Sequence, residues 1–343
     1  MNIVFRVDAS IEMGSGHLMR CLTYSEELKQ QNHKITFICR ESEGSLIGLI
    51  KHKNYKIVTL ATVDNFQSNS LYLNWLGATQ EQDAEQTIKV IPKNIDLLIV
   101  DSYALDEIWH KQLRPYTKKI MVIDDLADRQ FDCDVLLNQN LGIQKENYKN
   151  KVSNNCELLL GCDYALLRSE FSKIREKALE KRKNTKKIKN ILISMGGSDT
   201  QNRTYDILQE IADDLNIVVV LGSLSPYNAM IKTYAKDKNI EVIIDANNMS
   251  ELMFEADLAI GAGGSTSWER CCLGLPTLLF ITAENQRKIA ENLVKLDAVK
   301  VVDNLKENLQ DILNDFSLWQ TMSKRAQIVC DGLGVKRIKI WLK

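Results

Sequence analysis

The chain has 343 residues, a formal net charge of −1 at pH 7, and a composition that is 45% hydrophobic and 26% charged. A chain of this length is expected to form two domains whose cores need no disulfide or metal for stability. The near-zero charge argues against a nucleic-acid-binding protein that relies on bulk electrostatics, and four Pro and sixteen Gly exclude a collagenous or disordered chain.

The sequence shows no membrane or export signal. No apolar run reaches the roughly eighteen residues of a transmembrane helix, so we expect no membrane insertion. The N-terminus carries no positive segment ahead of a long apolar core, so we expect a cytoplasmic protein. The eight Cys show neither C-x-x-C nor zinc spacing, and we interpret them as buried reduced thiols.

The first half alternates predicted strands and helices. Residues 95–101 form a nearly continuous apolar run, which is typical of a central parallel strand buried on both faces. Periodicity and β-branched content predict strands at 3–8, 34–39, 55–60, 95–101, 119–124 and 134–138, and helices at 16–31 and 80–91. Asp8, Asp101 and Asp124 end predicted strands; each is interpreted as a local cap or a loop anchor, and no chemistry is assigned to it.

The second half repeats the pattern, with predicted strands at 190–195, 217–221, 241–244, 258–261 and 277–281 and a helix at about 202–213. Such alternation predicts an α/β protein with two Rossmann-like, doubly wound domains facing a cleft, with ligands at the carboxyl ends of the strands. We place the domains at 1–165 and 166–343, and leave open that the last helix packs back on the first domain.

A basic segment lies between the two halves. Residues 173–189 hold nine Lys or Arg and two Glu. A nucleic-acid patch is one interpretation and a solvated linker helix is the other. We favour the linker helix, because no aromatic residues interleave to stack on bases.

The first glycine loop, Gly14-Ser15-Gly16, stands between a predicted strand and a predicted helix. A dinucleotide fingerprint needs a third Gly or Ala where Met19 stands, so a nicotinamide-dependent dehydrogenase is disfavoured. A tight strand-to-helix turn explains the glycines equally well. Otherwise the loop brings backbone N–H groups close to an anion or a sugar at a helix N-terminus.

His17 follows this loop. The other three histidines, at 33, 52 and 110, lie in polar stretches typical of a surface. A neutral imidazole in the first turn behind a strand can act as a general base near pH 7. A purely structural His17 is the alternative.

Two further glycine motifs stand in the second half. Gly196-Gly197-Ser198-Asp199 suits a phosphate, or is simply a helix N-cap. In residues 261–269, a strand leads into a glycine turn and then a helix, an arrangement that suits a diphosphate, with Glu269 accepting hydrogen bonds from ribose hydroxyls. The alternative is a capping box between Ser265 or Thr266 and Glu269.

Together these residues resemble the GT-B nucleotide-sugar architecture and, more narrowly, the PseG-type UDP-sugar hydrolases of pseudaminic acid biosynthesis and their spore-coat polysaccharide relatives. The resemblance covers nearly the whole chain. The segments that carry it are 6–10, 14–22, 101–103, 136–140, 161–171, 195–199, 261–269 and 285–286. Of these, the segments at 6–22 and 261–269 are the specific ones.

The resemblance implies hydrolysis of UDP-2,4-diacetamido-2,4,6-trideoxy-β-L-altropyranose. Water attacks the anomeric carbon with inversion and UDP leaves, without metal or cofactor. The free sugar would then serve pseudaminic acid synthesis and flagellin glycosylation, and contact with other enzymes of that route stays open. UDP is a good leaving group, so one base and electrostatic support for the diphosphate suffice, without the carboxyl pair of ordinary glycosidases.

The same resemblance assigns site residues. His17 would activate or orient the water, with Tyr103 and Asn285 lining the sugar. The substrate-binding residues would be Gly14, Ser15, Gly16, Arg168, Gly197, Ser198, Asn248, Met249, Gly264, Ser265, Thr266, Glu269 and Gln286. Among these, Glu269 would hold the ribose, and the uracil would lie near Asn248 and Met249. A UDP-sugar glycosyltransferase and a non-catalytic nucleotide-sugar-binding protein are the alternatives.

Overall fold

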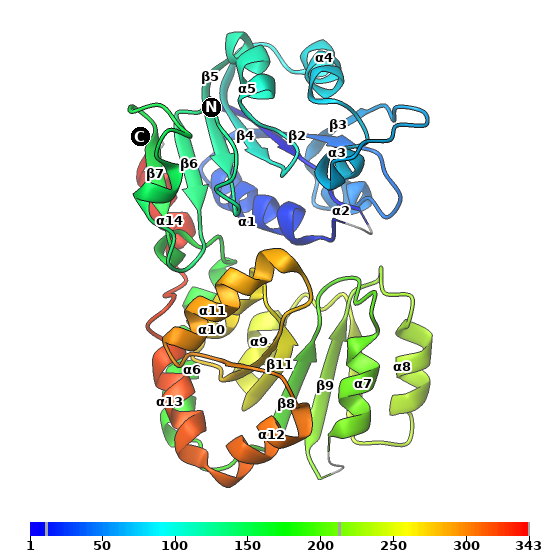
Figure 1. The fold of residues 1–343 in the computed structure, drawn as a ribbon, viewed down its shortest axis with the longest axis vertical. Helices are drawn as coiled ribbons and strands as arrows, with labels where there is room; N and C mark the ends of the chain where they lie inside the picture. Colours follow the sequence, from blue (N-terminus) through cyan, green and yellow to red (C-terminus); the bar gives the residue numbers. More distant parts are fainter. Residues whose placement is uncertain (11–12, 212–213, 342–343) are drawn as a thin grey trace. The chain divides into compact units, whose positions relative to one another are not determined.

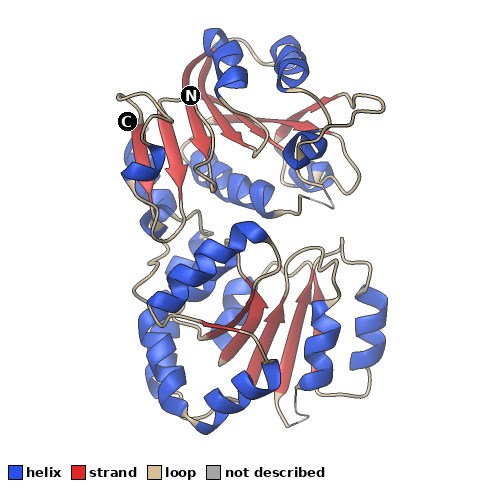
Figure 2. Ribbon diagram, viewed as in Figure 1, coloured by secondary structure: helices blue, strands red, loops and turns tan. Residues whose placement is uncertain are grey.

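The computed structural model describes residues 1–10, 13–211 and 214–341. The chain folds into two compact units. Unit 1 comprises Met1–Leu166 and Val335–Lys343, and unit 2 comprises Leu167–Gly334. Each is an α/β unit with one sheet (Figures 1 and 2), and each is described by itself.

Unit 1 is built on a seven-stranded sheet in the order β3-β2-β1-β4-β5-β6-β7, and every pairing in it is parallel. This agrees with the predicted doubly wound fold class. The strands are β1 (Asn2–Val7), β2 (Lys34–Arg40), β3 (Lys56–Leu60), β4 (Ile95–Asp101), β5 (Thr117–Ile123), β6 (Val135–Asn138) and β7 (Glu157–Leu160). β7 was not predicted from the sequence.

Helices cover both faces of this sheet. They are α1 (Gly16–Gln30), α2 (Ile47–His52), α3 (Leu71–Leu76), α4 (Gln80–Val90), α5 (Glu107–Leu113) and α14 (Gly334–Trp341), with short 3₁₀ turns η1 (Arg114–Tyr116), η2 (Lys145–Tyr148) and η3 (Cys162–Tyr164). Phe5 packs in one core cluster with Leu18 of α1, whereas its neighbour Val4 packs in another with Trp109 of α5. Successive residues of a strand point to opposite faces, so burial on both faces requires the continuous apolar runs seen in the sequence.

His110 corrects one expectation. It lies on α5 with 0% of its surface exposed, although the polar sequence around it indicated a surface residue. Its ring stacks on Phe131 at 6.0 Å between centroids, and neither ring nitrogen has a hydrogen-bond partner among the described residues. Burial lowers the pKa of His110 to about 3, because the protein interior disfavours the charged ring, and Arg129 and Arg114 add to this effect.

This burial predicts an acid-sensitive contribution to stability. The folded-state pKa of His110 lies below the ordinary value of 6.5, so the unfolded chain binds a proton first as the pH falls. Wild-type stability is therefore expected to fall between about pH 6.5 and 3, by about 1.4 kcal/mol per pH unit from this group. We expect the unfolding free energy of His110→Leu, measured by urea titration, to fall less steeply with decreasing pH over that range than that of the wild type. Equal slopes for the two proteins would contradict this account.

Unit 2 is built on a six-stranded sheet in the order β10-β9-β8-β11-β12-β13, again with parallel pairings. Its strands are β8 (Asn190–Ser194), β9 (Asn216–Leu221), β10 (Ile240–Ile244), β11 (Leu258–Ala262), β12 (Thr277–Phe280) and β13 (Lys300–Val301). The two-residue strand β13 was not predicted. The helices are α6 (Ser169–Asn184), α7 (Arg203–Glu210), α8 (Asn228–Ala235), α9 (Met249–Glu255), α10 (Thr266–Cys272), α11 (Arg287–Lys295), α12 (Leu305–Asn314) and α13 (Phe316–Ala326), with the 3₁₀ turn η4 (Glu284–Gln286).

The basic segment is not a solvated linker. It forms most of α6, which packs within unit 2 and buries Phe171 and Ala178. Arg182 is 4% exposed and donates hydrogen bonds to the carbonyl oxygens of Met253 and Ala256, at 2.7 and 2.6 Å. These carbonyls belong to the last turn and C-cap of α9. The Arg182 guanidinium therefore pairs with backbone carbonyl groups that have no partner within α9, at the negative end of the helix dipole.

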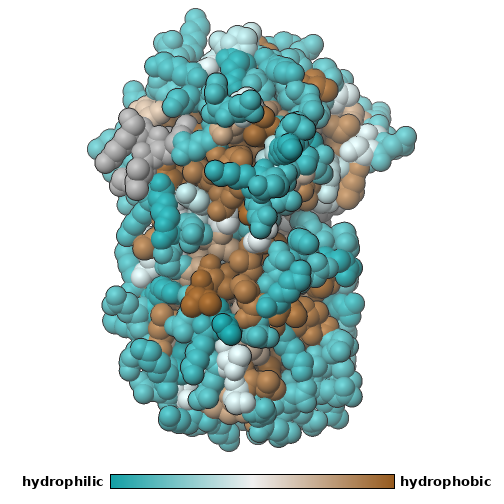
Figure 3. Space-filling view, turned by 60° about the vertical axis from the view of Figure 1, so that its left-hand side comes forward, coloured by the Kyte–Doolittle hydropathy of each residue, from teal (hydrophilic) through white to brown (hydrophobic). Residues whose placement is uncertain are grey.

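Polar side chains cover most of the face drawn in Figure 3, and apolar side chains gather there in smaller patches. Exposed apolar residues in unit 2 include Ile328, at 67%, and Val294, at 41%. No helix within the described ranges is both long enough and apolar enough to cross a membrane.

Candidate functional site

Unit 1 places His17 at the point where its strand order reverses. β1 leads through the first glycine loop into α1. In the sheet β1 lies between β2 and β4, and the strand order reverses between β1 and β4. Val7 at the end of β1 is in register with Asp101 at the end of β4. Ligands of open parallel sheets bind at such reversal points. The fold thus brings His17 to the carboxyl end of β4, next to Asp101.

A buried carboxylate holds the His17 ring. His17 is 7% exposed, and its Nδ1 lies 2.6 Å from Oδ1 of Asp101. Arg20, one turn further along α1, donates to both oxygens of the same carboxylate, each at 2.7 Å. Burial disfavours the charged form of Asp101, but Arg20 and His17 outweigh it and hold the pKa of Asp101 well below its usual range. Because the Asp101 carboxylate can only accept, we assign Nδ1 of His17 as the donor of this contact, which leaves Nε2 as the ring nitrogen that can accept a proton.

Asp125 extends this network to Tyr103. Arg20 donates to both oxygens of Asp125, at 2.9 and 2.8 Å, and the Tyr103 hydroxyl donates to Asp125 Oδ2 at 2.9 Å. The Tyr103 ring meets the His17 ring edge-on, with centroids 4.4 Å apart. Asn140 donates to the backbone oxygen of Asp125 at 3.2 Å. The structure therefore brings together two predicted residues, His17 and Tyr103, through three that were not predicted, Arg20, Asp101 and Asp125.

The other two strand-end aspartates in unit 1 are anchors, as the sequence analysis interpreted them. Asp8 accepts from the Arg6 guanidinium at 2.7 Å and from the backbone N–H of Arg40 at 2.6 Å. Asp124 accepts from the Tyr148 hydroxyl at 2.6 Å. Asp101 is different, because its partner is His17. Gly14 lies in the turn before α1, Ser15 is the N-cap and Gly16 is the first residue of the helix; Gly14 adopts φ +76°, in the region that favours glycine.

Unit 2 places its two glycine motifs on neighbouring strands. The 196–199 loop follows β8 and the 263–265 loop follows β11, and Gly261 is in register with Ser194. A Cβ at Gly261 would meet the Ser194 carbonyl oxygen and the Arg270 guanidinium, so this position requires glycine. Here too the strand order reverses, between β8 and β11, so both loops lie where an open sheet binds its ligand.

The alternative interpretations of these motifs have different outcomes. Asp199 accepts from the backbone N–H groups of Arg203 and Thr204, at 2.9 and 3.0 Å, in the first turn of α7. The N-cap residue itself is Asn202, so the N-cap interpretation is wrong about the position, although Asp199 does pair with N–H groups at this helix end. The capping box at α10 does not form. Its N-cap, Ser265, has helical dihedral angles and makes no side-chain cap bond. Thr266 is already the first residue of the helix.

Glu269 instead pairs with Arg168. The Arg168 Nη2 lies 3.5 Å from Glu269 Oε1, and its Nη1 lies 3.2 Å from Glu170. Burial raises the pKa of Glu269, and the Arg168 and Arg270 guanidinium groups act in the opposite direction. Two predicted substrate-binding residues are therefore in contact, on elements 101 residues apart in sequence.

Arg270 is a buried cation under the second glycine loop. It is 2% exposed and donates to the Ala262 carbonyl oxygen at 2.7 Å and to Ser267 Oγ at 3.1 Å. The same Oγ accepts from the backbone N–H of Gly264 at 3.3 Å. Both acceptors of the Arg270 guanidinium are uncharged. Burial lowers the pKa of Arg270 to about 10, and the Glu269 carboxylate acts in the opposite direction. Arg270 was not predicted from the sequence.

The remaining predicted residues are less closely grouped. Gln286 on η4 accepts from the backbone N–H of Thr282 at 3.0 Å and lies beside Gly263, and the exposed Asn285 precedes it. Gly197 and Ser198 lie in the loop after β8, with Gly197 packed against Gly222. Asn248 and Met249 begin α9, which follows β10. α9 packs against β8, the neighbour of β11 in the sheet.

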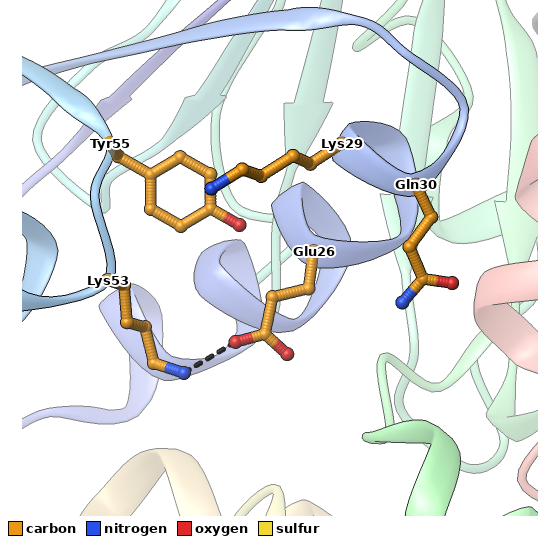
Figure 4. A pocket seen from close by; sticks show the side chains of 5 residues that line it. All are labelled: Glu26, Lys29, Gln30, Lys53 and Tyr55. Carbon is orange, nitrogen blue, oxygen red and sulfur yellow. Dashed lines mark hydrogen bonds and ion pairs between the residues drawn. The ribbon is translucent and has the colours of Figure 1, made fainter.

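A surface pocket lies at the other end of α1 (Figure 4). Its lining residues are Glu26, Lys29, Gln30, Lys53 and Tyr55. Lys53 pairs with Glu26 at 2.5 Å and Lys29 lies 4.8 Å from the centre of the Tyr55 ring, so both ammonium groups already have partners. None of the predicted site residues lines this pocket. In the described part of the chain, no cluster of three or more His, Cys, Asp or Glu is arranged to hold a metal ion.

Comparison with known proteins gives the chain a fold and distant relatives. Residues 169–327 match the glycosyltransferase family 28 C-terminal domain. The chain is 31% identical over 90% of its length to an uncharacterized protein of Methanocaldococcus jannaschii, of which it covers 61%. It is 29% identical to the UDP-2,4-diacetamido-2,4,6-trideoxy-β-L-altropyranose hydrolase of Campylobacter jejuni, over 86% of this chain and 97% of that one.

The solved structures agree on architecture. The crystal structure of Acinetobacter baumannii MurG superposes with a TM-score of 0.65 over 99% of both chains, at 16% identity. The chain has the GT-B fold. The two parallel sheets predicted from the alternating pattern are therefore confirmed, both in topology and by structural likeness.

Proposed function

We propose that the chain hydrolyses the anomeric C–O bond of a UDP-linked 2,4-diacetamido-2,4,6-trideoxy sugar, the altropyranose for which its Campylobacter relative is named. The observation that carries the chemistry is the His17–Asp101 contact of 2.6 Å, fixed by Arg20. In this proposal His17 Nε2 takes a proton from water. The water oxygen forms a bond to the anomeric carbon, and the C–O bond to the diphosphate breaks with inversion. The released UDP carries away the bonding electron pair.

Unit 2 would hold the nucleotide. Backbone N–H groups of the 196–198 and 264–266 loops can approach a diphosphate closely, because glycines keep the space above them open. Glu269 would accept from the ribose hydroxyls, with Arg168 beside it. Tyr103 and Asn285 would line the sugar. Dipoles fixed in this way stabilise charge on the departing diphosphate without side-chain reorganisation.

The direct test is incubation of the protein with the UDP sugar alone, in water enriched in oxygen-18. We expect UDP release without any acceptor, with the label in the anomeric hydroxyl of the free sugar. Label in UDP would mean attack at phosphorus and would overturn the mechanism. A panel of UDP-diacetamido sugars followed by NMR would identify the sugar.

A second candidate function is transfer of the sugar to an acceptor. It is favoured by the match of residues 169–327 to a glycosyltransferase domain. The same incubation separates the two functions, since a transferase releases UDP only when its acceptor is added. The assignment of UDP to unit 2 is common to both.

Arg270 gives the nucleotide site a specific prediction. A buried guanidinium whose hydrogen-bond acceptors are uncharged is costly, and a bound diphosphate would bring further negative charge to its side of the loop. We expect Arg270→Met to weaken UDP binding by at least about tenfold while changing uridine binding little, because uridine has no phosphates. Isothermal titration with both ligands measures this. If Arg270→Met lost affinity equally for UDP and for uridine, Arg270 would be a purely structural support of the loop.

A further inference from the structure

Two thiols in unit 1 are in contact, although 23 residues separate them in sequence. The Sγ atoms of Cys133 and Cys156 lie 3.6 Å apart. Cys133 is 3% exposed in a core cluster, and Cys156 is half-buried at its edge. From this geometry we propose that Cys133 and Cys156 are a site of reversible oxidation, where a peroxide converts the two thiols into a disulfide.

The backbone around the two cysteines favours this bond. Cys133 precedes β6 and Cys156 precedes β7, and these strands pair in parallel, with Val135 opposite Glu157. The Glu157 N–H donates to the Asp134 carbonyl at 2.9 Å, and the Asp134 N–H donates to Ile120 at 2.8 Å. Both strand starts are therefore fixed side by side. A disulfide needs its sulfurs about 2.05 Å apart, so they must approach by about 1.5 Å, which side-chain rotation and small backbone shifts can supply.

Exposure determines which thiol reacts first. Of the eight cysteines, Cys156 is partly exposed and the other seven are buried. The contact with the Cys156 thiol, and after it burial, raises the pKa of Cys133. Since the thiolate is the reactive form and must be reached by the oxidant, Cys156 is the attacked thiol and Cys133 the resolving one.

The chemistry balances with hydrogen peroxide as the oxidant. The Cys156 thiolate attacks one peroxide oxygen, the O–O bond breaks, and Cys156 sulfenic acid and hydroxide form. The Cys133 thiol then gives up its proton and attacks the Cys156 sulfur, so that the S–S bond forms and the S–O bond breaks with loss of water. In total, two thiols and one peroxide give one disulfide and two waters. A dithiol reductant reverses the change by thiol–disulfide exchange.

The pair lies away from the His17 network. Cys133 stands before the start of β6, whereas Asn140, which contacts Asp125, follows the end of that strand. We therefore expect oxidation to leave any UDP-sugar turnover within about twofold. The proposal is independent of the function proposed above.

Peptide mapping of the full chain tests the site. The protein is treated with a small excess of hydrogen peroxide, remaining thiols are alkylated, and the digest is analysed by mass spectrometry with and without dithiothreitol. We expect one dithiothreitol-sensitive cross-link joining the peptides of Cys133 and Cys156, with the other six thiols alkylated. A cross-link between other cysteines, or conversion of Cys156 to sulfinic acid without a cross-link, would overturn the proposal.

Single variants separate the two roles. Cys156→Ser should remove the cross-link and leave Cys133 unoxidised, whereas Cys133→Ser should leave a Cys156 sulfenic acid that dimedone traps. Cys330→Ser is the matched control, since Cys330 is 3% exposed in unit 2 and should leave the cross-link unchanged. Thermal melting of each reduced variant verifies that it folds. Oxidation of Cys133 in Cys156→Ser, or the absence of a dimedone adduct at Cys156 in Cys133→Ser, would contradict the assignment of the attacked and the resolving thiol.

Discussion

Replacing His17 with alanine is expected to lower turnover of the UDP sugar by about 10²- to 10⁴-fold, the range in which a positioned general base contributes. The variant loses the atom that accepts the water proton, Nε2, while Arg20 and Asp101 keep their mutual hydrogen bonds. UDP affinity should stay within about twofold, because the residues proposed to hold UDP belong to unit 2. Steady-state kinetics and titration with UDP measure the two quantities separately.

Two further variants of unit 1 serve as controls for His17. His52→Ala, at an exposed position on α2, should leave turnover unchanged. Asp101→Asn should lower kcat while leaving KM nearly constant, because the amide no longer selects the Nδ1–H form of the ring. Added imidazole should restore part of the activity of His17→Ala but none of that of Asp101→Asn. If His17→Ala turned over at the wild-type rate, the proposed base would be wrong.

The fold was predictable because strands buried on both faces consist almost entirely of apolar residues, which can be recognised in the sequence. The prediction for 95–101 coincides with β4, since a strand with both faces in the core has little room for polar residues. The missed strands are short: β7 has four residues and β13 has two. Edge strands of this length carry too few side chains for a periodic signal.

The candidate site was predictable only in part. His17 was identified from its place behind a glycine loop. The network of Arg20, Asp101 and Asp125 around His17 was not identified, because Arg20 lies 81 residues from Asp101 and 105 residues from Asp125 in sequence. Only the order of strands β1, β4 and β5 brings these groups together. Carboxylates at strand ends are common anchors, as Asp8 and Asp124 show, so an aspartate in that position does not by itself indicate a partner for histidine.

A second large effect is expected in the core of unit 1, where Asp83→Asn should lower the free energy of unfolding by about 3–5 kcal/mol, the usual result of removing one member of a buried ion pair. Asp83 on α4 is fully buried and accepts from Arg6 at 3.1 and 2.6 Å, from Arg40 at 2.7 Å, and from the Trp109 indole N–H at 2.9 Å. Asparagine keeps the size of the side chain but leaves two buried guanidinium groups without that negative charge. Urea unfolding followed by circular dichroism measures the change.

The same network gives a pH dependence and a matched control. Burial disfavours the Asp83 carboxylate, but Arg6 and Arg40 outweigh it and lower the pKa of Asp83 below its ordinary 3.8. Its stabilising contribution is thus fully present above the ordinary pKa and is lost as the pH falls toward the folded-state value, so the wild type and Asp83→Asn should converge in acid. Asp132→Asn removes a partly exposed partner of Arg114 and should cost at most about 1 kcal/mol. Water screens the exposed Arg114–Asp132 pair but not the buried Asp83 network. If the two variants lost similar amounts of unfolding free energy at pH 7, burial would not strengthen the Asp83 network.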